Sequence, residues 1–557
     1  LVANTTGHNN CSIGIGTMQI NTTGAENTAV GSNALQQNTT ASYNVAVGRL
    51  ALVANTTGAN NTAVGTYALD ANTTGAQNTA VGKNALGSNT TAGNNTAFGD
   101  RALASNSTGA SNTAVGGVAL NTNTTASDNT GIGYNALTTN TTGAGNTAIG
   151  YSASLQQTTA AYNTAVGWKS LFDCTTGSNN VAVGESSGQN ITTGQYNVAI
   201  GNTSLFTNTT SSHNTALGYG ALYTNTGEKN TAVGSNSLVY NTTGDSNTAV
   251  GYAALGANTT GTQNLAIGNF ALDASTTASH NVAVGYGVLT ANTSGNGNTG
   301  IGDSCLWSNT TGVSNTVIGK YALDSNTTGS YHIAMGDGAL GVNSTGSWNN
   351  ALGYKALYAN TTGVANVALG WESLVANTTG DKNVAIGNGA LRANTTHNGN
   401  VAVGYMALTA ATTATNTAVG YTALYTNTSG SQNAAFGAYT LYENTTGAGN
   451  AAFGSYCLYD NTTGHSNVAV GGWSPSTGGS NVIAALRMNS TGSLNTAIGV
   501  GALAYNTTGG SNTAVGHEAG DAITTGTVNT AVGRQALTQC TTGVANACIG
   551  EAAGHQI

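Results

Sequence analysis

Apolar and polar residues alternate in short segments that recur along the whole chain. In Asn61-Thr62-Ala63-Val64-Gly65, successive side chains alternate between two faces, and the pair Ala68-Leu69 follows two residues later. The segment Asn72-Thr73-Thr74-Gly75 then ends the pattern. Alternation with a period of two predicts a short strand, and Asn and Gly are residues that turns favour. Each stretch therefore predicts a strand, a second short apolar segment and a turn.

This pattern is one tandem repeat with the consensus N-T-A-V-G-x-x-A-L-x-x-N-T-T-G-x-x. It starts 32 times between Asn10 and Asn546, and 28 of the 31 intervals are 17 residues long. Two intervals, 214–230 and 400–416, are 16 residues, and the interval 467–495 is 28. Numbering from this Asn, position 5 is Gly in every unit, and position 1 is Asn in every unit except at His332.

The length of the repeat predicts the fold class. Seventeen residues are too few for a helical hairpin repeat, and the Thr-Thr-Gly segment breaks any continuous helix. We expect an all-β, parallel β-solenoid (a β-roll or β-helix) of 17-residue coils, about 32 units, of either hand. A single helical turn around the Ala-Leu pair is the alternative for that segment. Coils stacked about 4.8 Å apart would make a rod of roughly 150 Å.

Stacking places equal positions of successive coils in columns. We expect Val or Ile at position 4 and Leu at position 9 to form the apolar interior, and Asn at positions 1 and 12 to form amide ladders. Two large aliphatic side chains in each coil make a slender core, which barely offsets the entropy of ordering the coil. The sequence therefore predicts self-association, as a homotrimer around a threefold axis.

The repeat also divides the chain. We expect regular repeats over 1–466, an irregular unit with an 11-residue insertion over 467–494, and regular repeats over 495–557. The sequence opens and closes inside a unit, so we expect an interior stretch of a longer protein or filament, open at the C-terminal end. It shows no signal peptide and no apolar run near the roughly 20 residues of a membrane helix.

Composition excludes several classes of protein. Only 30 of the 557 residues are charged, 80 are Gly, one is Pro, and the net charge is −8. Eleven scattered basic residues cannot form the positive stripe that nucleic acid binding requires. The near absence of Pro excludes collagen, and the regularly placed aliphatic residues disfavour disorder.

Two families share this pattern. The segment Asn146-Thr147-Ala148-Ile149-Gly150 resembles the N-S-V-A-I-G-type repeat in the head domains of trimeric autotransporter adhesins, which implies a trimeric left-handed β-roll. The unit 416–430 resembles the N-T-A-V-G-Y-x-A-L-x-x-N-T-T-G repeats of phage and viral tail-fibre-like proteins. The adhesin repeats are shorter, and neither an adhesin neck, stalk or barrel nor a tail-fibre chaperone occurs in the sequence. Both resemblances imply an extracellular fibre, on a cell surface or a virion.

The Asn-Thr-Thr corner matches the acceptor pattern for N-linked sugars. The candidate glycosylation sites are Asn21, Asn38, Asn55, Asn72 and Asn89. The alternative is an unmodified ladder of turns. The threonine rows also resemble the flat threonine arrays of ice-binding solenoids, which makes ice binding a further alternative.

The 28-residue interval is the one large break in the repeat. It contains Trp473, the single proline Pro475, and Arg487, which together form a candidate recognition loop. The alternative is a tolerated or packed-down loop. Tyrosines gather at positions 6 and 10, where they could bind glycans or partners, or pack over the neighbouring coil.

No arrangement of side chains indicates catalysis, a cofactor or a metal. The G-x-G-x-x-G match at 336–341 comes from the repeat and lacks a βαβ context. His213 and His280 share a repeat position but lie four coils apart, too far to bind one ion. Glu443 and Asp460 fall on adjacent coils, where they could share a cation or form a solvated corner. The six cysteines occupy unrelated positions, which favours small buried residues over a disulfide framework.

The sequence therefore predicts a non-enzymatic, extracellular structural fibre that acts as a rigid adhesive shaft or spacer. Its expected partners are copies of itself, as a homotrimer or an end-to-end filament, and host-surface glycans or receptors. A phage or viral tail fibre and a self-assembling glycosylated matrix filament are the alternatives.

Overall fold

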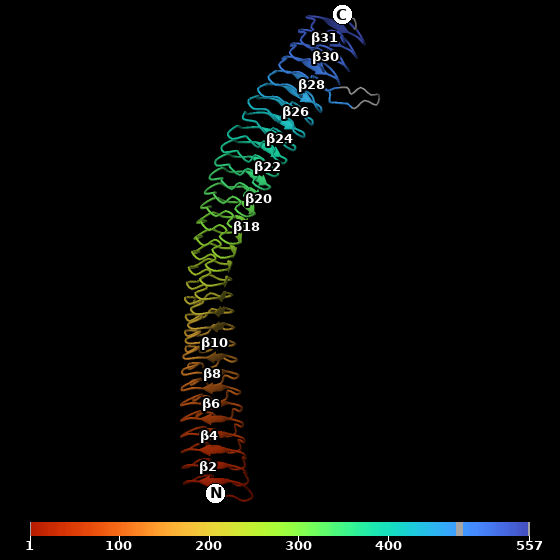
Figure 1. The fold of residues 1–557 in the computed structure, drawn as a ribbon. Coiled ribbons are helices and arrows are strands. Elements are labelled where there is room, and N and C mark those ends of the chain that lie inside the picture. The colour runs from red at the N-terminus through yellow and green to blue at the C-terminus, as the bar shows by residue number, and fades with distance from the viewer. Residues whose placement is uncertain (1, 475–482, 555–557) are drawn as a thin grey trace. The chain divides into compact units, whose positions relative to one another are not determined.

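A computed structural model describes residues 2–474 and 483–554, which form an all-β parallel solenoid. Each coil has one three-residue strand at positions 2–4, and turns form the rest. The contacts divide the chain into two compact units, Leu1–Ser279 and His280–Ile557. Figure 1 shows the strands stacked along the chain in each unit. The described residues contain no helix long and apolar enough to cross a membrane.

The unit Leu1–Ser279 contains sixteen strands, and each pairs in parallel with the next. They are β1 Cys11–Ile13, β2 Thr28–Val30, β3 Val45–Val47, β4 Thr62–Val64, β5 Thr79–Val81, β6 Thr96–Phe98, β7 Thr113–Val115, β8 Thr130–Ile132, β9 Thr147–Ile149, β10 Thr164–Val166, β11 Val181–Val183, β12 Val198–Ile200, β13 Thr215–Leu217, β14 Thr231–Val233, β15 Thr248–Val250 and β16 Leu265–Ile267.

The unit His280–Ile557 is built in the same way from the other sixteen strands. They are β17 Val282–Val284, β18 Thr299–Ile301, β19 Thr316–Ile318, β20 Ile333–Met335, β21 Asn350–Leu352, β22 Val367–Leu369, β23 Val384–Ile386, β24 Val401–Val403, β25 Thr417–Val419, β26 Ala434–Phe436, β27 Ala451–Phe453, β28 Val468–Val470, β29 Thr496–Ile498, β30 Thr513–Val515, β31 Thr530–Val532 and β32 Ala547–Ile549.

The strand register follows the repeat. Thr62 in β4 pairs with Thr79 in β5, 17 residues later, and the 16-residue intervals before β14 and β25 keep the same alignment. The 28-residue interval keeps it too, because Val468 in β28 pairs with Thr496 in β29. The predicted parallel solenoid of 17-residue coils is therefore confirmed, and its register is kept across all three irregular intervals.

The interior is narrower than the sequence predicts. Ala at position 3, Ala at position 8 and Leu at position 9 are buried, as at Ala63, Ala68 and Leu69. Position 4 points outward, so the prediction that Val or Ile forms an interior column is wrong. Side chains at positions 2 and 4 share the face opposite to position 3, because a strand alternates its side chains. Little space remains at position 3: a Cβ on Gly300 would lie 2.6 Å from Cγ1 of Val288.

Glycine at position 5 turns the chain out of the strand. Gly65 has a φ of +134°, and a Cβ there would lie 2.5 Å from the carbonyl oxygen of Gly82 in the next coil. Both the backbone conformation and the close approach therefore require Gly. Positions 7, 9 and 17 also adopt left-handed conformations, with φ of 61° at Tyr67, 50° at Leu69 and 59° at Asn60. Each coil closes through these four corners.

Candidate functional site

Two columns of asparagine side chains run inside the stacked coils. At position 1, Oδ1 of Asn61 accepts the backbone N–H of Asn78 at 2.9 Å, and its Nδ2 donates to the carbonyl of Gly75 at 2.9 Å. At position 12, Nδ2 of Asn72 donates to Oδ1 of Asn55 and to the same Gly75 carbonyl, both at 2.9 Å. The position-15 carbonyl thus accepts from both columns, and the predicted ladders are confirmed.

The candidate glycosylation sites belong to the position-12 column. The side chains of all five are fully buried, and each Nδ2 donates to the carbonyl three residues ahead. These residues are Asn21, Asn38, Asn55, Asn72 and Asn89. A sugar on Nδ2 would remove these hydrogen bonds and would not fit inside the coil. Glycosylation here stays a prediction that requires attachment before the coil closes.

The two threonines of the corner differ in accessibility. The hydroxyl of Thr56, at position 13, donates to the carbonyl of Thr73 in the next coil at 3.0 Å, and the side chain is half-buried. Thr57, at position 14, is exposed. Only one hydroxyl of each pair is therefore free to face solvent, which weakens the ice-binding alternative for this corner.

Aromatic side chains form columns on the turn that follows the strand, most densely beside β24–β28. One column contains Tyr405, Tyr421, Tyr439, Tyr456 and Trp473, and a second contains Tyr425, Tyr442 and Tyr459. In the second column, successive ring centroids lie 5.2 and 5.1 Å apart and the rings are nearly parallel. The predicted packing of rings over the neighbouring coil is confirmed. Stacking covers the ring faces and leaves the ring edges as the outward surface.

Both aromatic columns end at the irregular coil. Trp473 meets Tyr456 edge-on with centroids 6.4 Å apart, and the guanidinium of Arg487 lies 5.1 Å from the centre of the Tyr459 ring. Arg487 also lies 3.5 Å from the carboxylate of Asp460. Burial raises the pKa of Asp460, and the positive charge of Arg487 opposes that shift. A cation and an acid therefore stand together at the end of an aromatic surface.

Two of the three predicted recognition residues line one pocket there. This pocket has a volume of about 370 Å³ and is lined by Trp473, Arg487, Tyr456 and Ile483. Pro475 lies outside the described residues. The sequence marked Trp473 and Arg487 through the irregular interval, but it did not show that the tyrosine columns lead to them. The usable signal is the run of tyrosines at positions 6, 7 and 10 in the units before the interval.

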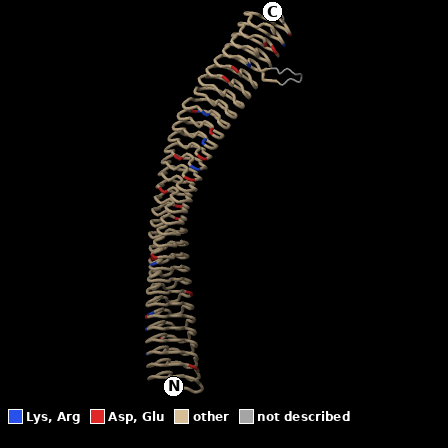
Figure 2. The backbone as a smooth tube through the Cα atoms, viewed as in Figure 1, with Lys and Arg blue, Asp and Glu red and all other residues tan. Residues whose placement is uncertain are grey.

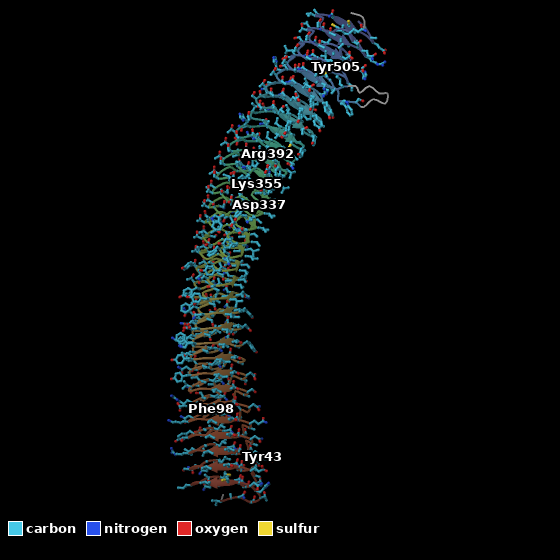
Figure 3. The ribbon with its side chains drawn as sticks, in the orientation of Figure 1. Tyr43, Phe98, Asp337, Lys355, Arg392 and Tyr505 are labelled. Atoms are coloured by element: carbon cyan, nitrogen blue, oxygen red, sulfur yellow. The ribbon has the colours of Figure 1, made fainter. Side chains whose placement is uncertain are left out.

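The outward side of the strands is a second candidate surface. Position 4 is Val, Ile, Leu, Phe or Met in all 32 described strands, and position 2 is never charged. We call these outward residues of β1–β16, and separately those of β17–β32, the strand-face strip. Its larger members protrude: Phe98 is 56% exposed. Figure 3 labels Phe98 on this strip and Tyr43 in the turn before a strand.

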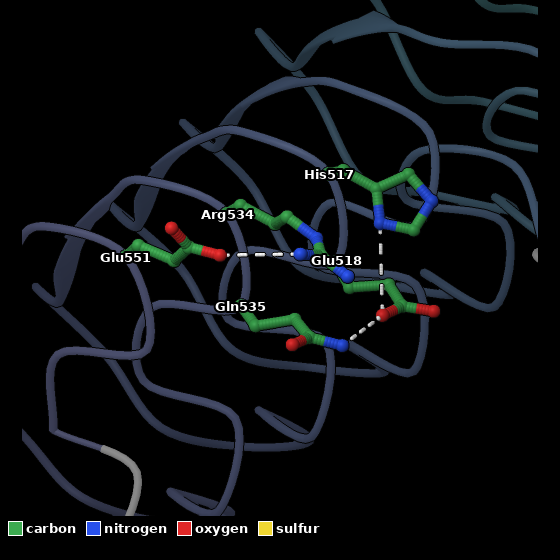
Figure 4. A network of polar contacts seen from close by, with 5 residues as sticks. All are labelled: His517, Glu518, Arg534, Gln535 and Glu551. Atoms are coloured by element: carbon green, nitrogen blue, oxygen red, sulfur yellow. Dashed lines mark hydrogen bonds and ion pairs between the residues drawn. The ribbon is translucent and has the colours of Figure 1, made fainter.

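Charged residues lie in the turns and not in the strands. Figure 2 shows how sparsely they are spread along the backbone. Figure 4 shows one group near the C-terminus, where Arg534 is 3.1 Å from Glu551 and Gln535 donates to Glu518 at 2.8 Å. His517 is 3.6 Å from Glu518. Most of these contacts link adjacent coils at the surface, where ion pairs contribute little stability. Within residues 2–474 and 483–554, no three His, Cys, Asp or Glu side chains are grouped to hold a metal ion.

His332 occupies position 1 without interrupting that column. Its backbone N–H donates to Oδ1 of Asn315 at 3.0 Å, and its Nδ1 accepts the backbone N–H of Asn349 at 3.2 Å. The ring also hydrogen-bonds with the carbonyl of Gly346, to which the position-1 amide donates in other coils. Nε2 of the ring lies 3.3 Å from Nδ2 of Asn343. Burial lowers the pKa of His332 to about 4, so the neutral ring replaces the amide at pH 7.

The buried cysteines are core residues. Cys305 and Cys457 replace Ala at position 8, and burial raises the pKa of each thiol to about 12. These thiols are therefore protonated and unreactive at neutral pH. Cys11 is exposed in β1.

A comparison with models of known protein families finds no match for this sequence, and a search among curated proteins finds none either. The surfaces described above are therefore what supports a function.

Proposed function

We propose that the chain is a non-enzymatic, extracellular structural fibre, a rigid shaft that carries an adhesive site. The repeated coil supports the shaft. Within each unit, strand pairing, the asparagine columns and the Thr hydroxyl ladder join one coil to the next. Fifteen steps of about 4.8 Å make each unit on the order of 70 Å long. Because each coil contacts mainly its neighbours, stability adds along the stack.

The adhesive role depends on one observation, the convergence of both aromatic columns on the pocket at the irregular coil. Pockets that bind small ligands are concave, mostly apolar and carry a few polar groups. Here Tyr456, Trp473 and Ile483 supply the apolar walls, and Arg487 with Asp460 supplies donors and acceptors for hydroxyl groups. This combination suits a surface glycan, which has apolar ring faces and many hydroxyls.

Electron microscopy of the purified full chain tests the shaft. We expect elongated particles whose length grows with the number of coils, so that deleting four whole repeats shortens them by about 19 Å. Deleting the same number of residues out of phase with the repeat is the control, and it should disturb the stack. Compact particles from the intact chain would contradict the shaft.

Binding to a glycan array tests the adhesive site. We expect the intact chain to bind, and Trp473→Ala and Arg487→Ala to lower the affinity at least roughly tenfold, because each removes a wall or a donor of the pocket. Trp168→Ala is the matched control, since Trp168 is 45% exposed and Trp473 is 43% exposed. Equal losses in all three variants, or no glycan binding by the intact chain, would overturn this assignment.

A further inference from the structure

The strand-face strip carries apolar side chains at position 4 and mostly Thr or aliphatic side chains at position 2, with no charged residue among them. Ile132, Ile149 and Leu217 are exposed members in one unit, and Phe436 and Phe453 stack at 4.9 Å in the other while remaining exposed. All charged residues lie in turns, so none of them interrupts the strip. An apolar centre with a polar rim is the composition of protein interfaces, and contiguous exposed apolar surface marks interaction sites.

The strip is also strictly periodic. Val64, Val81 and Phe98 are register partners in successive strands, so position 4 forms one column with the strand spacing of about 4.8 Å. A second copy of the chain has a strip with the same period. A contact made at one coil therefore recurs at the next, whereas a globular partner would match the strip over only a few coils. The periodicity favours a copy of the chain as the partner.

The strip is large enough for a stable interface. Each unit contributes two outward side chains from each of its sixteen strands, 32 in all, whereas a standard interface uses roughly 20–30 residues a side. Two such faces would pack about 10 Å apart, like the sheets of a β-sandwich. The narrow interior adds a reason for pairing, because Leu at position 9 is the single large aliphatic side chain buried inside most coils.

We propose that the strand-face strip pairs two copies of this chain face to face. This inference names the partner of the shaft and rests on the proposed function. The sequence predicts a homotrimer, but the geometry of the strip favours two copies. Two strips can face each other across their full width, whereas three strips around one axis meet only at their edges. The shaft is then a double solenoid with a dry, uncharged seam.

Analytical ultracentrifugation and small-angle scattering of the full chain test the pairing over a range of concentrations. The test variant is Phe98→Lys with Ile132→Lys, which places two charges in the seam. The matched control is Tyr43→Lys with Tyr162→Lys, at exposed turn positions of the same unit. We expect two chains per assembly for the intact chain and the control. We expect the strip variant to dissociate with a constant raised at least roughly thirtyfold.

Circular dichroism verifies the fold of both variants. If the lysines disturb it, Phe98→Ser with Ile132→Ser removes the apolar contact without a charge, and it should also weaken the assembly. Single chains at every concentration, three chains per assembly, or equal dissociation of variant and control would overturn the pairing. Electron microscopy separates this failure from failure of the shaft, because elongated single-chain particles retain the shaft and compact ones do not.

Discussion

The two asparagine columns inside the coils differ in the changes they tolerate. Position 1 is Asn in every unit except at His332. Position 12 departs from Asn in eight units, at Gln157, Cys174, Ile191, Ser275, Ala411, Ile523, Cys540 and Ile557. Both columns are buried and both donate to the position-15 carbonyl, so burial alone does not explain the difference.

The acceptor atoms explain it. At position 1, Oδ1 binds a backbone N–H of the next coil, as between Asn61 and Asn78, and a backbone N–H that lost this acceptor would be buried without a partner. At position 12, Oδ1 binds another side chain, as between Asn55 and Asn72. A substitution there leaves no backbone N–H without an acceptor, because the Nδ2 that loses this Oδ1 still donates to its position-15 carbonyl, as Asn72 does to Gly75. His332 is tolerated at position 1 because its Nδ1 still accepts the backbone N–H.

Each break in the position-12 column leaves one buried acceptor behind. Oδ1 has no hydrogen-bond partner in Asn140, Asn258, Asn394 and Asn506. Each of these residues lies one coil before a unit that lacks Asn at position 12. Each break therefore lowers the stability through one unpaired acceptor only. This loss of stability does not grow with each further Asn that is replaced, so the column can be interrupted over several successive coils.

The largest effect is expected from breaking the position-1 column. Asn61→Ala leaves the N–H of Asn78 without its acceptor and removes the bond to the Gly75 carbonyl. We expect a loss of roughly 3–5 kcal/mol in local stability. Hydrogen exchange read by mass spectrometry across β4 and β5 measures it, with the exposed Thr57→Ala as control. Unchanged protection in Asn61→Ala would contradict the role assigned to this column.

The histidine that replaces Asn at position 1 makes the column sensitive to acid. The pKa of His332 is about 4 in the folded chain against an ordinary 6.5, so the unfolded chain binds the proton first as the pH falls. We expect stability around His332 to be complete above pH 6.5 and to decrease by up to about 3 kcal/mol by pH 4.

Urea unfolding followed by tryptophan fluorescence measures this decrease, because Trp348 stacks on Tyr331 beside His332. His332→Asn restores the amide and is the control. Its unfolding midpoint should change much less between pH 6.5 and pH 4. A midpoint equally sensitive to pH in both proteins would show that other groups dominate.

A substitution in the position-12 column should cost less. Asn55→Ala leaves Oδ1 of Asn38 without a donor and removes the bond to the Gly58 carbonyl, but no backbone N–H loses its acceptor. We expect a loss of about 2 kcal/mol, smaller than for Asn61→Ala. Hydrogen exchange over the same strands compares the two variants directly. A larger loss in Asn55→Ala would reverse the ranking of the columns.

Repairing a break should have the smallest effect and the opposite sign. Ser275→Asn supplies a donor for the unpaired Oδ1 of Asn258 and replaces a serine hydroxyl that has no partner of its own. We expect a gain of about 1 kcal/mol in local stability, measured as slower hydrogen exchange around β15 and β16. Ser275→Ala is the control and should not reproduce it. A gain of equal size in Ser275→Ala would mean that removing the hydroxyl is sufficient.

Much of the fold is predictable from the sequence because each coil repeats the same requirements. The spacing of Gly65 and its equivalents marks the coil length, and the asparagines mark the ladders. The sequence does not show in the same way which face of the strand points inward, because the alternation in Thr62-Ala63-Val64 fits either orientation. Hydrophobicity favours Val64 inside, but the space beside Leu69 accommodates only a small side chain in most coils. Where Val317 does occupy position 3, its register partner is Gly300.

The candidate site is predictable only in part. Trp473 and Arg487 stand out because the interval that contains them breaks the repeat. The pocket itself does not stand out in the sequence, because its walls come from two different coils. The side of the turn on which Tyr456 lies depends on the backbone angles at the corners. The sequence does not predict the strand-face strip either, because hydrophobicity favours Val64 and its equivalents in the interior.

β28 and β29 keep their register across eleven extra residues, and this tolerance affects how the length of the gene can change. One regular coil corresponds to 17 codons, and almost any coil can follow any other with its ladders aligned. Unequal recombination between repeats in the gene would therefore change the length of the protein in whole steps and preserve the reading frame and the hydrogen bonding together. The reach of such a molecule can change from one generation to the next without a search for a new fold.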